Sequence, residues 1–128
     1  MRLLLDTHIA LWALTDSPHL PARARALIAD PANEVFHSAA SVWEIAIKHA
    51  LARRDMPLSG DEAVRLFTEA GYVEVPVTAR HAATTESLPP HHADLFDRLL
   101  VAQALVEPMH LITHDRQLMK YGHPVMYV

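Results

Sequence analysis

The chain of 128 residues contains no cysteine. This absence excludes a disulfide scaffold, a thiol nucleophile and every zinc or iron–sulfur site that depends on thiolate ligands. Glycine is scarce too. The three glycines are widely spaced, so neither glycine-rich phosphate-binding loop, Walker-type or dinucleotide-type, can occur. The length allows one domain, which we expect to span residues 1–128.

Long apolar runs are also absent. The basic start of the chain and the leucines at 3–5 resemble a signal peptide, but Asp6 interrupts the run. The next apolar stretch, residues 9–14, is too short for a secretory signal. No segment has enough consecutive apolar residues for a membrane-spanning helix. We therefore expect a soluble, cytoplasmic protein with no membrane partner.

The chain has no basic tail and no long block of Lys and Arg, and its formal net charge is −4 with the ten histidines counted as neutral. The usual electrostatic footprint of a protein that coats duplex nucleic acid is therefore missing. A net charge of −4 is still compatible with a nuclease, because acidic residues gathered in one metal site can dominate the total charge.

Predicted strands and helices alternate along the whole chain. Short apolar or alternating runs predict strands over residues 2–5, 34–38, 72–77, 110–113 and 125–127. Helical spacing and capping residues predict helices over 8–14, 21–29, 41–48, 61–70, 79–88 and 95–107, and a short one ending at 121. Trp12 is expected to face the core, and the polar stretch 53–60 to be the loosest. This order implies an α/β/α sandwich around a mostly parallel sheet of about five short strands.

Two aspartates directly follow strands that are expected to be buried. Asp6 comes after the strand 2–5, and Asp115 comes two residues after the strand 110–113. In open α/β sheets, ligands bind beyond the carboxyl ends of the strands, where the strand order reverses. The two aspartates are therefore expected to converge from distant parts of the chain.

Two further acids, Glu44 and Asp97, are expected in the first turns of their helices. If these helices begin at the same edge of the sheet, four carboxylates form one cluster. Like charges held close together raise each other's pKa unless a cation compensates them. Mg²⁺ or Mn²⁺ prefers oxygen ligands and would resolve the conflict. The matching chemistry is phosphodiester hydrolysis, in which the metal activates water and neutralises developing charge.

Each of these acids also has a purely structural explanation. Ser41 and Glu44 have the spacing of a capping box. Asp97, like Asp94 before it, suits the positive end of a helix dipole. The two acids that follow strands could be helix N-caps or turn residues. The joint occurrence of all four acids favours the metal site.

The histidines follow no known ligand spacing such as His-Glu-x-x-His. His91 and His92 are therefore interpreted as solvent-exposed or hydrogen-bonding residues. His114 is the one of interest, because it neighbours Asp115.

Four segments together carry a family resemblance. They are LLLDTH at 3–8, SAASVWEIAIK at 38–48, PPHHADLFDRLLVAQA at 89–104 and LITHD at 111–115. With them the chain resembles the PIN-domain ribonucleases and, among these, the VapC-like toxins of type II toxin–antitoxin systems. The segments occur in the family's order and span nearly the whole chain, and it is their combination that is specific.

The resemblance implies catalytic and metal-binding roles for Asp6, Glu44, Asp97 and Asp115. Asp94 lies in the same matched segment and is given a supporting role, with the alternative that it shares or replaces the role of Asp97. The four acids show no departure from the family pattern, which favours an active enzyme with Mg²⁺, or Mn²⁺ as a substitute.

The resemblance also implies what surrounds these acids. Thr7 and Thr113 are expected to orient ligands or a metal-bound water. RNA contacts are expected from a local basic set that could equally be an ordinary solvated helix end: Lys48, His49, Arg53 and Arg54.

By resemblance, the function is that of an endoribonuclease toxin. The chain would form a homodimer and be neutralised by a cognate antitoxin whose gene lies beside its own. The alternative is a catalytically silent PIN module that acts through protein or RNA binding. A phosphoacceptor module fits less well, because Asp6 is followed by Thr7 and His8 and no lysine follows the strand 110–113.

Overall fold

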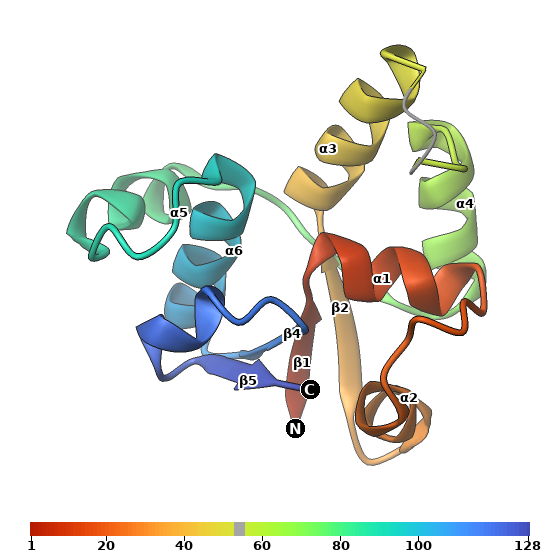
Figure 1. The fold of residues 1–128 in the computed structure, drawn as a ribbon, viewed down its shortest axis with the longest axis horizontal. Coiled ribbons are helices and arrows are strands. Elements are labelled where there is room, and N and C mark those ends of the chain that lie inside the picture. Colours follow the sequence, from red (N-terminus) through yellow and green to blue (C-terminus); the bar gives the residue numbers. More distant parts are fainter. Residues whose placement is uncertain (53–55) are drawn as a thin grey trace.

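The computed structural model describes residues 1–52 and 56–128. Its strands form one sheet in the order β3-β2-β1-β4-β5 (Figure 1). They are β1 (Arg2–Leu5), β2 (Glu34–Ser38), β3 (Val73–Val75), β4 (His110–Thr113) and β5 (Val125–Tyr127). Every pair of neighbouring strands is parallel, which confirms the predicted α/β sandwich with its sheet of about five short strands.

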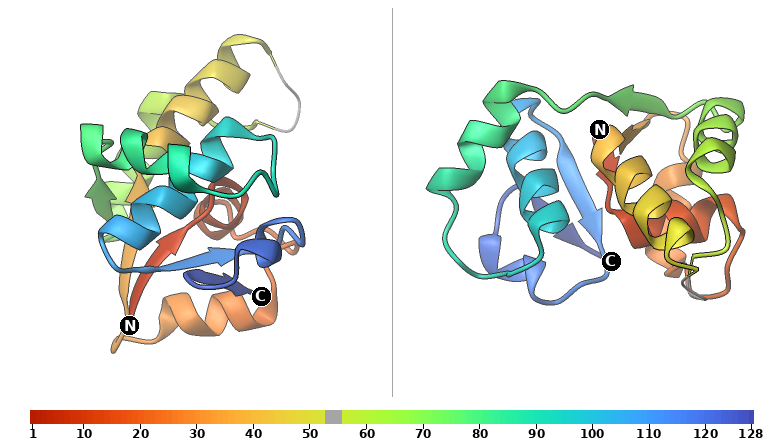
Figure 2. Two further views of the ribbon diagram at one scale, coloured as in Figure 1. Left: turned by 90° about the vertical axis from the view of Figure 1, so that its left-hand side faces the viewer. Right: turned by 90° about the horizontal axis from the view of Figure 1, so that it is seen from above.

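Helices cover both faces of the sheet (Figures 1 and 2). They are α1 (Thr7–Leu14), α2 (Ala22–Ala29), α3 (Ala39–Ala50), α4 (Gly60–Glu69), α5 (Ala79–Thr84) and α6 (Leu95–Val106), with 3₁₀ turns η1 (Thr85–Ser87) and η2 (Leu118–Tyr121). The helices α1, α2 and α4 pack on one face and α6 on the other, whereas α3 extends beyond the end of β2.

The central strand β1 shows why its sequence is a continuous apolar run. Successive side chains of a strand point to opposite faces, so Leu3 and Leu5 pack with α1, α2 and α4, whereas Leu4 packs with α6. All three leucines are fully buried. Because both faces of the parallel sheet are covered, the strand is buried from Leu3 to Leu5 and only its first residue, Arg2, is exposed.

The strand order reverses between β1 and β4. From β1 the chain runs outward through β2 to β3, and it then returns to pair β4 with the other side of β1. Open parallel sheets bind ligands at the carboxyl ends of the strands at such a reversal. Asp6 and Asp115 both lie at this point of the fold.

The start of α3 corrects the predicted capping box. The helix begins at Ala39, directly after β2, and Ser38 caps it by accepting a hydrogen bond from the backbone N–H of Ala40 at 3.0 Å. Ser41 is therefore inside the helix, and Glu44 lies in its second turn and not in its first. The expected helix 41–48 was too short because β2 runs into α3 without a connecting turn.

Other boundaries also differ from the prediction. β3 ends at Val75 because Pro76 has no backbone N–H for the sheet, and β3 is an edge strand. The helix predicted over 79–88 changes to a 3₁₀ turn at Thr85.

The polar stretch 53–60 was expected to be the loosest part of the chain. Its residues 53–55 lie outside the described residues, whereas Met56 is buried in the core. Among the described residues, no helix is long and apolar enough to cross a membrane.

Candidate functional site

Thr113 connects the ends of β1 and β4. Its buried hydroxyl donates a hydrogen bond to Oδ2 of Asp6 and accepts one from the backbone N–H of Asp115 at 3.0 Å. The other carboxylate oxygen of Asp6 accepts from the N–H of Ile9 at 2.8 Å and so caps α1. Both aspartates are thereby fixed at the same edge of the sheet. The predicted N-cap role of Asp6 is confirmed, and it leaves the carboxylate beside the strand ends.

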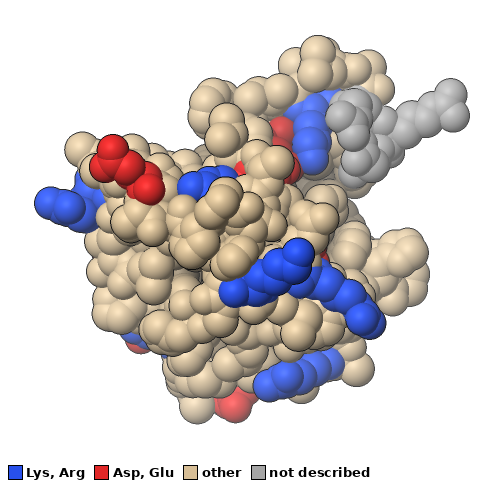
Figure 3. All heavy atoms as spheres, turned by 60° about the vertical axis from the view of Figure 1, so that its left-hand side comes forward, with Lys and Arg blue, Asp and Glu red and all other residues tan. Residues whose placement is uncertain are grey.

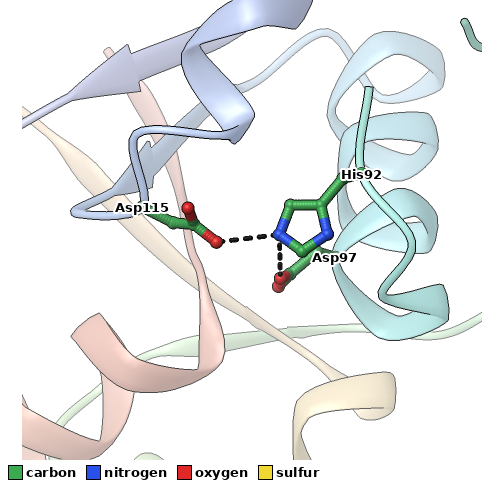
Figure 4. Close-up of side chains that lie close together, drawn as sticks. All are labelled: His92, Asp97 and Asp115. Atoms are coloured by element: carbon green, nitrogen blue, oxygen red, sulfur yellow. Dashed lines mark hydrogen bonds and ion pairs between the residues drawn. The ribbon is translucent and has the colours of Figure 1, made fainter. Parts of the chain in front are cut away.

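Asp97 and Asp115 face each other across the imidazole of His92 (Figure 4). The Nε2 atom of His92 lies 2.8 Å from Oδ2 of Asp115 and 3.3 Å from Oδ2 of Asp97. Nδ1 of His92 accepts from the backbone N–H of Asp94 at 3.0 Å, so Nε2 carries the proton and donates to Asp115, with Asp97 in ion-pair range. One ligand atom from each of the three half-buried residues lies within 4.8 Å of the others.

The pKa of Asp97 reflects both its burial and its acidic neighbours. Burial raises the pKa of Asp97 to about 7, and the negative charges of Asp94, Asp6 and Glu44 contribute to this rise, whereas His92 opposes it. A cation bound beside Asp97 would favour its ionised form and so oppose the rise in pKa.

The pKa of Asp6 is raised as well. Burial raises its pKa, with a smaller contribution from Asp115, while the hydrogen bonds from Thr113 and Ile9 act in the opposite direction. The aspartate is 4% exposed, so removing it from water strongly disfavours its ionised form unless a cation is close.

Glu44 joins this group from α3. It is also 4% exposed, and its Oε2 lies 2.6 Å from Nζ of Lys48, one helical turn further along α3. The start of α3 is tied to the start of α1, because the hydroxyl of Thr7 donates to Oγ of Ser41 at 2.9 Å. Thr7 therefore contacts Ser41, whereas Thr113 contacts Asp6 directly.

Asp94 and Asp97 have different local roles. Asp94 is exposed and caps α6, since its Oδ1 accepts from the backbone N–H of Asp97 at 3.1 Å. The carboxylate of Asp97 points toward His92 and Asp115 (Figure 4). This geometry favours Asp97 over Asp94 as the ligand, and the assignment stays a prediction.

His92 was expected only as a solvent-exposed or hydrogen-bonding residue, and its hydrogen bonds place it among the acids. The histidine of interest was His114, because of its neighbour Asp115, but Nδ1 of His114 contacts the carbonyl oxygen of Val128. His92 reaches Asp115 from 23 residues away, through the segment that leads into α6. One feature of the sequence could have pointed to His92. It lies two residues before Asp94, which caps α6, and the first turn of that helix was expected at the site.

The carboxylates fit a hard divalent cation. Asp6, Asp97 and Asp115 offer oxygen ligands, as Mg²⁺ and Mn²⁺ prefer. His92 would add a nitrogen ligand only by losing its Nε2 proton, and Mn²⁺ accepts such a nitrogen more readily than Mg²⁺.

Comparison with protein families decides the class. The PIN domain family matches residues 3–124. This chain belongs to the PIN domain family. No curated protein matches the chain with significance. The family resemblance inferred from the four segments is therefore confirmed.

Solved structures share the fold of this PIN domain. A chain of VapBC2 from Rickettsia felis, bound to a DNA fragment of its promoter, aligns with a TM-score of 0.71 and 13% identity, over 100% of this chain and 98% of that one. VapBC-1 from nontypeable Haemophilus influenzae aligns with a TM-score of 0.64 and 17% identity, over 100% of this chain and 97% of that one. A toxin–antitoxin complex from Klebsiella pneumoniae aligns with a TM-score of 0.64 and 19% identity, over 97% of this chain and 95% of that one. At these identities the likeness concerns the fold of the PIN domain.

Proposed function

We propose that this PIN domain is a divalent-cation-dependent endoribonuclease and the toxin of a toxin–antitoxin pair, acting in the cytoplasm. The observation that carries the proposal is that Asp97 and Asp115 lie with His92 within ligand distance of one another, beside Asp6, where the strand order reverses. Glu44 is close enough to contribute to the raised pKa of Asp97. Family membership supports the same chemistry.

The three aspartates would hold Mg²⁺ or Mn²⁺, and Glu44 would bind the cation or position the attacking water. When bound, the cation supplies a water of lowered pKa and neutralises charge on the phosphate. Thr113 fixes the carboxylate of Asp6, and Lys48 holds that of Glu44. These contacts keep the acids oriented before substrate arrives, which is what phosphodiester hydrolysis requires.

RNA would be bound by local positive charge despite the net charge of −4. On the face that carries α5 and α6, Lys and Arg side chains are visible at several places and few acidic atoms are in view (Figure 3). In the predicted basic set, Lys48 is engaged with Glu44 and His49 is exposed, while Arg53 and Arg54 lie outside the described residues.

The test uses purified chain, free of any partner, with total RNA and with DNA in EDTA, Mg²⁺ or Mn²⁺. We expect RNA cleavage only with a divalent cation, and its loss in Asp97→Asn. The matched control is Asp94→Asn, which keeps an N-cap on the same helix and should retain cleavage. Cleavage by Asp97→Asn equal to that of the unaltered chain contradicts the site. Folded protein that cleaves nothing leaves the silent PIN module as the alternative.

A cognate antitoxin is the expected partner. Three structures with this fold are toxin–antitoxin complexes. We expect the product of the adjacent gene to co-purify with this chain and to suppress its RNA cleavage. Independent migration of the two proteins, with cleavage unchanged, would contradict the pairing.

A homodimer is the expected assembly. Trp43, Ile47 and Leu51 follow one another at intervals of four along α3 and are 61%, 37% and 68% exposed. Leu95, at the start of α6, is 79% exposed, and the ring of Phe96 lies 5.3 Å from that of Trp43. Exposed apolar side chains gathered on one face are typical of an interface. We assign this face to a second copy, because a two-fold axis would pair like surfaces.

A further inference from the structure

A cavity of about 280 Å³ opens beside the acidic group. Asp6 and Asp115 line one part of it, and the rest of its lining consists of His8, Trp12 and His114. His8 and Trp12 are four residues apart, and therefore on the same face of α1, and His114 follows β4 directly. A substrate bound at the two aspartates would extend into a space lined by rings.

The rings form a continuous line. The centroid of Trp12 lies 5.8 Å from that of His8 and 6.3 Å from that of His114, with interplanar angles of 48° and 66°. His114 stacks on Tyr127 at 5.2 Å and 17°, and the guanidinium of Arg116 lies 5.9 Å from the centre of the Tyr127 ring. His19 also lies against Trp12, at 5.8 Å and 38°, so none of the three imidazoles around the indole is parallel to it.

The exposure of these rings distinguishes them from core residues. The sequence predicted that Trp12 faces the core, and the indole does pack against it, but Trp12 is only half-buried because another part of it lines the cavity. His8 and His114 are exposed. Aromatic and imidazole rings at an open site are the surfaces on which proteins stack unpaired bases of RNA.

The charge of the cavity favours an uncharged occupant. Asp6 and Asp115 would repel a phosphate unless a cation lies between them, whereas a nucleobase carries no charge and can stack on the rings. The base of a nucleotide is one sugar away from its phosphate. A phosphate held at the acids therefore leaves an adjacent base within reach of Trp12 and His114.

We propose that this cavity is a subsite for one unpaired nucleobase of single-stranded RNA, stacked against Trp12 between His8 and His114. The inference rests on the proposed ribonuclease function and adds to it the way in which the substrate strand is held beside the acids. Arg116, at the end of the line of rings, is placed to contact the phosphate that follows the stacked base.

The first test measures binding in Ca²⁺, which supplies positive charge between Asp6 and Asp115, and again in EDTA, so that it does not depend on cleavage. The chain has two tryptophans, and Trp43→Phe leaves Trp12 as the only indole. We expect a ten-nucleotide single-stranded RNA to quench the emission of Trp12, and a duplex of the same sequence to do so far less. An abasic nucleotide moved along the strand should abolish the quenching at one position.

The second test measures the affinity of the same labelled RNA for variants. Trp12→Ala should bind about tenfold or more weakly, the scale found for loss of one stacked base, while Trp12→Phe should keep most of the affinity. His8→Ala and His114→Ala alter exposed positions, so they carry the test if Trp12→Ala does not fold. The matched control is His110→Ala, because His110 begins β4 at the end of the strand opposite Thr113.

The outcomes separate this inference from the proposed function. Unchanged RNA affinity in the Trp12 and His114 variants overturns the subsite, even if Mn²⁺-dependent cleavage is intact. Quenching of Trp12 by N-acetyl-arginine amide but not by RNA also overturns it, since the cavity would then accept a protein side chain. Position-dependent quenching in Ca²⁺ or in EDTA supports the subsite, even if no divalent cation elicits cleavage and the proposed function fails.

Discussion

The hydroxyl of Thr113 donates its hydrogen bond to the carboxylate of Asp6, 107 residues earlier in the chain. The same oxygen accepts from the N–H of Asp115, so one small side chain fixes the carboxylate that follows β1 and the backbone that follows β4. Water cannot easily replace the hydroxyl in its bond to Asp6, since Thr113 is fully buried and Asp6 nearly so.

Thr113→Val keeps the shape of this side chain and removes its donor. We expect Mn²⁺ affinity to fall by about 10- to 100-fold, as is typical when a partner that orients a metal ligand is lost. Titration calorimetry with Mn²⁺ measures this directly. Thr113→Ser keeps the hydroxyl and should retain most of the affinity. Equal Mn²⁺ affinity in the Val and Ser variants would show that the hydrogen bond does not orient a ligand.

Asp97 should make stability depend on pH when no divalent cation is present. Its pKa is about 7 in the folded chain against an ordinary 3.8, so the folded state holds a proton that the unfolded state releases. The resulting stabilisation is complete below about pH 4 and is lost as the pH rises toward 7. Urea midpoints at pH 5 and pH 8 in EDTA should therefore differ more for the unaltered chain than for Asp97→Asn. The same pH difference in both proteins would contradict the assignment.

His37 should make the chain less stable as the pH falls, which is the opposite of the effect of Asp97. It is 4% exposed, its ring stacks on Phe67 at 4.1 Å, and its Nδ1 has no hydrogen-bond partner among the described residues. Burial lowers the pKa of His37 from its ordinary 6.5, so only the unfolded chain takes up a proton as the pH first falls below that value. The free energy of unfolding should therefore decrease with falling pH.

The variant His37→Phe tests this expectation. It keeps the stacking on Phe67 and removes the unpaired nitrogen, so we expect a gain of about 1 kcal/mol at neutral pH. It should also show a weaker decrease of stability between pH 7 and pH 5. Denaturant titrations at pH 7 and pH 5 measure both effects. A His37→Phe variant less stable than the unaltered chain at pH 5 would contradict the role given to His37.

The proposed dimer face should be sensitive to charge. Leu51→Glu or Leu95→Glu places a carboxylate in the predicted contact and should convert a dimer into a monomer, as measured by light scattering during size exclusion. Met119→Glu is the matched control, because Met119 is 50% exposed on η2 and lies outside that face. A chain that is monomeric before any substitution, or a dimer that survives both charges, would contradict the assignment.

The sequence predicted what depends on local patterns. Alternating strands and helices, and an aspartate directly after a buried run of leucines, identified the sheet and one corner of the site. The capping box at Ser41 was wrong because Ser38 has the same chemistry three residues earlier, and the end of β2 decided between them. The contact of His92 with Asp115 depends on the path of a connecting segment, which no local pattern encodes. Trp12 faces the core only in part, and helical spacing does not reveal where a sheet edge leaves a helix uncovered.

The pairing of β1 with β4 also determines when the acidic site can exist during synthesis. β4, which carries Leu111 and Ile112 and pairs with β1 on the side opposite β2, is made about 100 residues after β1. Until then Asp6 has no Thr113 to hold it and no Asp115 beside it. A nascent chain, or one shortened before β4, therefore carries the first acid of the candidate site without its partners.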